Sequence, residues 1–129
     1  MNARLKMKSL LTITAIFEAA TGLALLAFPT LILPMLLGIS ITEPAGLLVC
    51  RIGGAALITL AIACWLAKNE EKSAIALIKA LVFYNLAALL LLCYAGGVQH
   101  LSGLGLWPAV FLHVALFVWC IMSQRKRVH

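Results

Sequence analysis

An apolar run from Leu10 to Phe28, interrupted by the carboxylate of Glu18, constrains the fold of this chain more than any other feature. A helix of about 20 apolar residues spans the hydrocarbon core of a bilayer. A carboxylate near the middle of such a helix costs roughly 2.5–3.5 kcal/mol on insertion scales. The run therefore predicts a membrane-spanning helix, and Glu18 predicts a polar partner inside the membrane.

The composition places the whole chain in the same class. Of its 129 residues, 64% are hydrophobic and 11% are charged, and the mean hydropathy is +1.11. Soluble domains are about half apolar and a quarter charged. We expect one all-α domain over residues 1–129, a membrane four-helix bundle with no room for a soluble catalytic or nucleic-acid-binding domain.

Four membrane spans are expected, over residues 9–28, 45–67, 74–95 and 106–123. Between the first two, the apolar segment Leu31 to Gly38 is too short to cross a bilayer. We expect it to form a short interfacial or re-entrant piece, with a longer, proline-kinked first helix as the alternative. Thr42 with Pro44 predicts the start of the second span, and Asn69 is a candidate cap for the third.

The net charge of +6 reflects basic groups at the ends of the spans rather than a nucleic-acid surface. Four spans place both termini and the central charged loop on one side. The basic residues of that side are Arg4, Lys6, Lys8, Lys68, Lys72, Lys79, Arg125, Lys126 and Arg127. Under the positive-inside rule this bias predicts that both termini are cytoplasmic.

Each expected span carries one strongly polar residue near the middle of the membrane: Glu18, Arg51, Asn85 and His113. At about 1.5 Å of rise per residue their depths fall close together. Polar side chains avoid lipid, so we expect the four to meet inside the bundle, with Arg51 forming an ion pair with Glu18. That pair has a structural, a ligand-binding and a proton-handling interpretation. Tyr84 and Thr21 are further candidates for the same site.

Other chemistry finds little support in the chain. It contains no metal-ligand spacing, nucleophile triad or phosphate-binding glycine loop, so we expect no metal and no cofactor. The four cysteines all lie in apolar runs and are expected to be free thiols. Gly46, Cys50 and Gly54 recur at four-residue intervals, a stripe that favours close helix packing within the chain or in a homo-oligomer.

Several stretches resemble small bacterial four-helix membrane proteins that are similar in size and plan to the DoxX-like proteins. They are residues 18–26 (Glu-Ala-Ala-Thr-Gly-Leu-Ala-Leu-Leu), 51–54 (Arg-Ile-Gly-Gly), 63–65 (Ala-Cys-Trp), 84–85 (Tyr-Asn) and 106–113 (Leu-Trp-Pro-Ala-Val-Phe-Leu-His). The likeness covers nearly the whole chain. It implies four helices and a bacterial inner membrane, and it implies no particular activity.

Three functions are consistent with these features. The first is a site within the bundle for a small amphipathic or lipid-like ligand. The second is a non-catalytic accessory or scaffold subunit, whose polar centre holds the helices together. The third is a small proton-coupled exporter, which the strong charge bias disfavours because it forbids dual topology. The sequence leaves open whether any reaction is catalysed.

Overall fold

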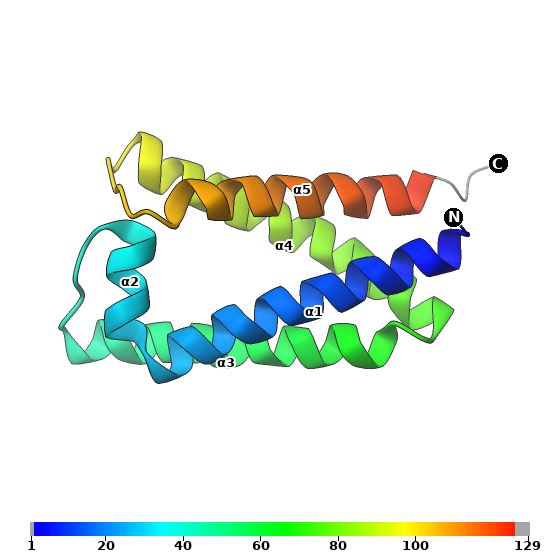
Figure 1. Cartoon of the computed structure of the whole chain (residues 1–129), viewed down its shortest axis with the longest axis horizontal. Coiled ribbons are helices and arrows are strands. Elements are labelled where there is room, and N and C mark those ends of the chain that lie inside the picture. The colour runs from blue at the N-terminus through cyan, green and yellow to red at the C-terminus, as the bar shows by residue number, and fades with distance from the viewer. Residues whose placement is uncertain (1, 126–129) are drawn as a thin grey trace.

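Five helices make up most of the chain in the computed structural model, which describes residues 2–125 (Figure 1). They are α1 (Ala3–Ala27), α2 (Pro29–Leu37), α3 (Pro44–Ala67), α4 (Glu71–Gly97) and α5 (Leu106–Arg125). No strand occurs in this described part. Every helix except α2 is long and apolar enough to cross a membrane. The all-α class is therefore confirmed, and the four long helices have the length and composition expected of the predicted spans.

The long helices extend a few residues beyond several of the predicted spans, because caps rather than hydrophobicity decide where a helix starts. Helix α1 begins at Ala3, where the Asn2 side chain accepts a hydrogen bond from the N–H of Arg4 at 3.3 Å. Helix α3 begins at Pro44 as predicted, although its N-cap is Glu43 rather than Thr42 and makes no side-chain capping bond. Lys126 and Arg127, predicted anchors of the C-terminal end, lie outside the described residues.

The cap of α4 is also one residue later than predicted. Glu70, not Asn69, is its N-cap, and its carboxylate accepts hydrogen bonds from the N–H of Lys72 at 3.0 Å and of Ser73 at 2.6 Å. Unpaired N–H groups at a helix start attract a carboxylate in this way. Hydrogen bonds from the side chain and backbone of Ser73, and from the backbone of Lys72, hold the pKa of Glu70 below its usual value.

The segment after α1 forms a separate short helix rather than a continuation of the first span. The backbone breaks at Phe28 and restarts at Pro29, and α2 ends at Gly38, whose φ of +74° lies in the left-handed region. Figure 1 shows α2 turned across the ends of the long helices. The predicted alternative of one long kinked helix is therefore wrong.

Backbone contacts fix α2 against the connection between α4 and α5. The N–H of Ser102 donates to the carbonyl of Leu37 at 3.2 Å, and the N–H of Gly105 donates to that of Met35 at 2.8 Å. Between them, a Cβ on Gly103 would lie 2.3 Å from the backbone carbon of Leu36. Only glycine allows this approach, and α2 is held in place as a result.

The long helices associate as two antiparallel pairs, α1 with α3 and α4 with α5 (Figure 1). The first pair approaches most closely where two glycines meet. A Cβ added to Gly22 would lie 2.7 Å from the carbonyl oxygen of Gly54, and the reverse distance is also 2.7 Å. Of the predicted small-residue stripe, Gly54 thus contacts α1, whereas Gly46 faces Ile41.

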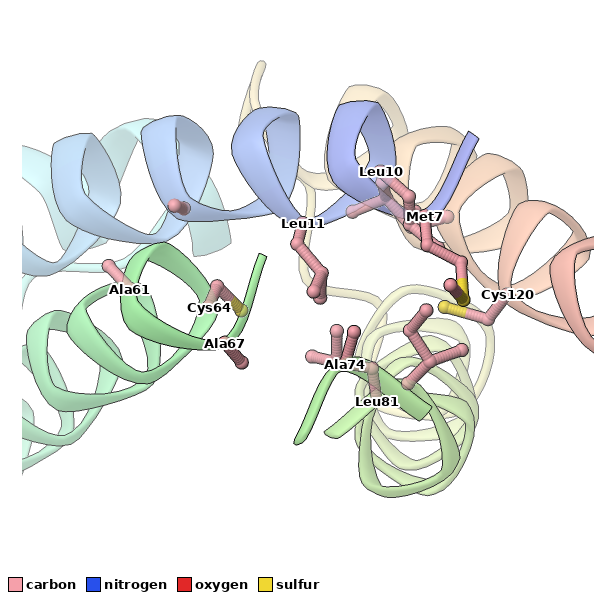
Figure 2. Close-up of a cluster of buried hydrophobic side chains, with 12 residues drawn as sticks. Met7, Leu10, Leu11, Ala61, Cys64, Ala67, Ala74, Leu81 and Cys120 are labelled. Atoms are coloured by element: carbon pink, nitrogen blue, oxygen red, sulfur yellow. The ribbon is translucent and has the colours of Figure 1, made fainter. Parts of the chain in front are cut away.

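The buried apolar core lies toward one end of the molecule. It joins the first half of α1 to the end of α3, the start of α4 and the end of α5 (Figure 2). Its members are Met7, Leu10, Leu11, Ala15, Ala61, Cys64, Ala67, Ala74, Ile78, Leu81, Leu116 and Cys120. The polar residues Glu18, Tyr84 and His113 lie further along the bundle toward α2 than most of this core.

A candidate ligand site in the membrane region

Glu18 is buried where α1 meets α4. Only 4% of its surface is exposed, and its Oε2 atom accepts a hydrogen bond from the hydroxyl of Tyr84 at 3.1 Å. Glu18 sits one turn before Gly22, where α1 packs tightly on α3, and this contact fixes the helix that carries it. The predicted polar partner of Glu18 is therefore a tyrosine.

A second polar contact joins α4 to α5. Nδ1 of His113 lies 2.9 Å from Oδ1 of Asn85, and Nδ2 of Asn85 donates to the carbonyl of Leu81 at 2.8 Å. Asn85 is fully buried. A buried amide with both ends bonded holds its neighbour in one orientation, so Asn85 fixes the imidazole of His113 from behind.

The ring of Tyr84 connects the two contacts. Its centroid lies 5.7 Å from that of His113 with an angle of 77° between the planes, an edge-to-face arrangement. Glu18, Tyr84, His113 and Asn85 thus form a continuous chain of contacts across three helices. Three of the four residues predicted for the membrane centre are brought together in this way.

This chain of contacts borders a cavity of about 310 Å³. Its polar lining comes from Glu18, Thr21, Tyr84 and His113, and Asn85 stands behind the wall rather than in it. The remaining lining is apolar: Phe17, Leu25, Leu36, Leu57, Ala88, Leu91, Leu92, Ala109 and Leu112. A small group of polar atoms in a mostly apolar concave wall is typical of ligand sites.

Arg51 does not join this group. Its side chain is exposed, and it makes no hydrogen bond or ion pair with any residue in 2–125. The predicted ion pair with Glu18 is therefore absent from the described part of the chain.

The physical reason is the crossing of α1 and α3 at Gly22 and Gly54. Glu18 precedes Gly22 by four residues, and Arg51 precedes Gly54 by three. The helices are antiparallel, so the two displacements point in opposite directions. At 1.5 Å per residue they separate the two residues by roughly 10 Å along the axes.

A hydroxyl close to this site has no partner. Thr14, four residues before Glu18 on α1, is fully buried, and its Oγ1 makes no hydrogen bond within residues 2–125. The four-residue spacing places both side chains on one face of the helix.

The apolar wall is what the sequence could not identify. Leu36 lies on α2 and Leu57 on α3, and neither differs in type from the many leucines that face outward. All five helices are apolar around most of their circumference, so periodicity gives no inward face. The position of α2 is the missing information, because it brings Leu36 to the cavity.

The described residues contain neither a cluster of metal-ligating side chains nor a disulfide. Within 2–125 no group of three or more His, Cys, Asp and Glu side chains converges. Cys50, Cys64, Cys93 and Cys120 are free thiols. The site can accept and donate hydrogen bonds and can hold a proton on a carboxylate or an imidazole.

These features describe an all-helical protein with four helices long and apolar enough to cross a membrane and with a polar, partly enclosed site between them. Comparison with protein-family models, with curated proteins and with solved structures gives no match. The resemblance to DoxX-like proteins therefore stays a prediction.

Proposed function

We propose that this chain is a small protein of the bacterial inner membrane that binds a lipophilic molecule with a polar head group. One observation carries the proposal: an apolar cavity of about 310 Å³ whose wall includes Glu18, Tyr84 and His113. Ligand pockets start at roughly 300 Å³. The volume suits one small lipophile or the head and first carbons of a longer one.

The rim of the cavity supports entry from the bilayer. Phe17 and Leu91 both line it, yet 44% and 69% of their surfaces are exposed. In a membrane these exposed apolar side chains face acyl chains. A lipophile therefore reaches the cavity sideways, without crossing a charged surface.

Each polar residue then has a role that its contacts support. Glu18 and His113 face the head group of the ligand, Tyr84 holds Glu18, and Asn85 orients His113. Thr21 adds an exposed hydroxyl at the lining. Arg51 takes no part.

The orientation in the membrane follows from charge. The start of α1, the α3–α4 connection and the end of α5 lie at one end of the molecule (Figure 1). These segments carry Arg4, Lys8, Lys68, Lys72 and Arg125. We assign this end to the cytoplasm by the positive-inside rule, which places α2 and the cavity toward the outer half of the bilayer.

A cavity-filling substitution tests the proposal. Ala88→Phe places a ring in the cavity, whereas the matched control Ala80→Phe adds the same ring to an exposed position of α4. The protein is purified in its native membrane lipids, and the extracted small molecules are quantified by mass spectrometry. We expect a non-phospholipid molecule in wild type and in Ala80→Phe, and its loss from Ala88→Phe. Equal content in the two variants contradicts the proposal.

The scaffold function remains the second candidate because the polar contacts also join helices. The Tyr84–Glu18 bond links α4 to α1, and the His113–Asn85 bond links α5 to α4. Glu18→Gln separates the two functions, since glutamine still offers Tyr84 an acceptor. Normal folding with loss of ligand indicates binding, and normal folding with full ligand content and unchanged phenotype indicates a scaffold.

A further inference from the structure

We propose that the cavity selects an uncharged lipophile whose head group carries a hydroxyl, because His113 offers it a hydrogen-bond acceptor. This inference rests on the proposed function and names its ligand class. It follows from the orientation of one buried amide and from which polar atoms the protein leaves without a partner.

The orientation of Asn85 is fixed by its backbone neighbour. The carbonyl oxygen of Leu81 can only accept a hydrogen bond, so the amide atom 2.8 Å from it must be the NH₂ nitrogen. The oxygen of the same amide then faces Nδ1 of His113 at 2.9 Å. The reversed amide would set two acceptors against each other at Leu81.

The tautomer of His113 follows directly. An amide oxygen only accepts, so Nδ1 of His113 must carry the hydrogen. A neutral imidazole with hydrogen on Nδ1 has a bare lone pair on Nε2. Within residues 2–125 no carboxylate forms an ion pair with His113. A charge on this half-buried ring would lack a counterion, and the neutral form is favoured.

Apart from the exposed hydroxyl of Thr21, the donors around the cavity are already used by the protein. The hydroxyl of Tyr84 donates to Glu18, Nδ1 of His113 donates to Asn85, and the amide of Asn85 donates to Leu81. Nε2 of His113 and Oε1 of Glu18 make no hydrogen bond in the described residues. A ligand in the cavity thus meets the lone pair on Nε2 of His113, which only a hydrogen-bond donor satisfies.

This pattern discriminates between head groups. A hydroxyl donates to Nε2 and can still accept from Thr21, which lines the same cavity. A ketone, an ester or a methyl ether can accept from Thr21, but it has no donor for Nε2 and leaves that lone pair unsatisfied. An ammonium group would donate and could pair with Glu18, but it loses more hydration than a neutral hydroxyl on entering a mostly apolar wall.

A set of matched probes tests the inference on the wild-type protein in lipid nanodiscs. The probes are 4-octylphenol, its methyl ether 4-octylanisole, and the cation 4-octylbenzylamine. They share the tail and the ring and differ in the head. One hydrogen bond to an otherwise unsatisfied buried acceptor predicts that the phenol binds about tenfold more tightly than the ether, measured as dissociation constants by native mass spectrometry.

Two further readouts isolate His113. Nitrogen-15 NMR of histidine-labelled protein reports the tautomer directly, and we expect hydrogen on Nδ1 in wild type and a changed distribution in Asn85→Leu. His113→Phe should reduce the preference for phenol over ether to within about twofold, whereas the control His100→Phe, outside the cavity, should retain it.

The outcomes separate this inference from the proposed function. Equal binding of phenol and ether, tighter binding of the amine, or hydrogen on Nε2 would each overturn the hydroxyl assignment while leaving the cavity a ligand site. Absence of binding by all three probes, together with no effect of Ala88→Phe on co-purified molecules, would overturn the inference and the proposed function together.

Discussion

Tyr84 is the residue on which the polar site depends most. Its hydroxyl bonds to Glu18 on α1 and its ring edge contacts His113 on α5, so one side chain relates two other helices. A buried carboxylate keeps its place only if some group satisfies it. Among residues 2–125 that group is the neutral hydroxyl of Tyr84, and no guanidinium contributes.

Substitution of Tyr84 by phenylalanine tests this role. Tyr84→Phe removes the hydroxyl and keeps the ring, so the free energy of unfolding in detergent should fall by about 1 kcal/mol, the usual size of a hydrogen bond between membrane helices. Tyr94→Phe is the matched control, because Tyr94 lies on the same helix with an exposed side chain and its hydroxyl makes no hydrogen bond within residues 2–125. Equal free energies of unfolding for the two variants would contradict this role of the Tyr84 hydroxyl.

The sequence identifies polar residues in apolar runs, but it does not identify their partners. Glu18, Asn85 and His113 were predicted to meet, and they lie along one chain of contacts. Arg51 was predicted to join them from its depth and from the tendency of polar side chains to avoid lipid. Depth says nothing about the direction of a side chain around its helix, and α1 and α3 cross at a point that separates Arg51 from Glu18.

At the scale of the helices, the Gly22–Gly54 crossing sets the position of α1. The first pair of helices can approach so closely only because neither position carries a Cβ. Glu18 lies one turn from this crossing. A change in the crossing therefore moves the carboxylate relative to Tyr84.

Neighbouring glycines provide a matched test. Gly54→Ala would set a methyl 2.7 Å from the backbone of α1, and the strain should lower the free energy of unfolding by about 1–3 kcal/mol. Gly53→Ala meets nothing within 4 Å. It should be neutral or stabilising by up to about 1 kcal/mol, because alanine favours helix. Thermal denaturation in one detergent measures both, and a smaller loss for Gly54→Ala than for Gly53→Ala would contradict the packing.

The cap of α4 gives a pH-dependent prediction. The folded pKa of Glu70 is lowered by the hydrogen bonds of Ser73 and Lys72, so its contribution to stability is complete above the ordinary glutamate value of 4.5. This contribution is lost as the pH falls through the lowered pKa of Glu70 in the folded protein. Glu70→Ala should therefore reduce the melting temperature near neutral pH and have no effect in strong acid.

Glu43→Ala is the control for that experiment. Glu43 is the N-cap of α3, but its side chain makes no capping hydrogen bond. Its substitution should leave the melting temperature nearly unchanged across the same pH range. A neutral-pH difference for Glu70→Ala that persists unchanged in acid would contradict the capping role.

At the scale of the molecule, the packed core and the cavity adjoin, because Tyr84 and Leu112 pack against the core and also line the cavity. The core joins the first half of α1 to the end of α5 (Figure 2), and the cavity extends as far as Leu36 on α2. Four apolar runs were enough to predict the spans, because length and hydropathy decide which segments can cross a bilayer. They were not enough to predict α2 as a wall of the site. That depends on backbone contacts with residues 98–105, which leave no hydrophobic pattern.

Reporter fusions test the proposed orientation of the whole chain. Green fluorescent protein joined after His129 should be fluorescent, and alkaline phosphatase inserted in the connection at residues 98–105 should be active, because the proposed orientation places the basic end in the cytoplasm. The exchanged fusions serve as controls and should both be inactive. The reverse pattern would place the cavity toward the cytoplasmic half.

Photoaffinity labelling tests whether the cavity beneath α2 holds a lipophile. Wild-type protein in nanodiscs is irradiated with an alkylphenol that carries a diazirine in its tail, with and without excess 4-octylphenol, and labelled peptides are sequenced. We expect labels on cavity residues such as Leu57, Ala88 and Leu112, and we expect excess 4-octylphenol to reduce them. Labels confined to outward-facing residues such as Ile52 and Leu66, unaffected by the competitor, would contradict it.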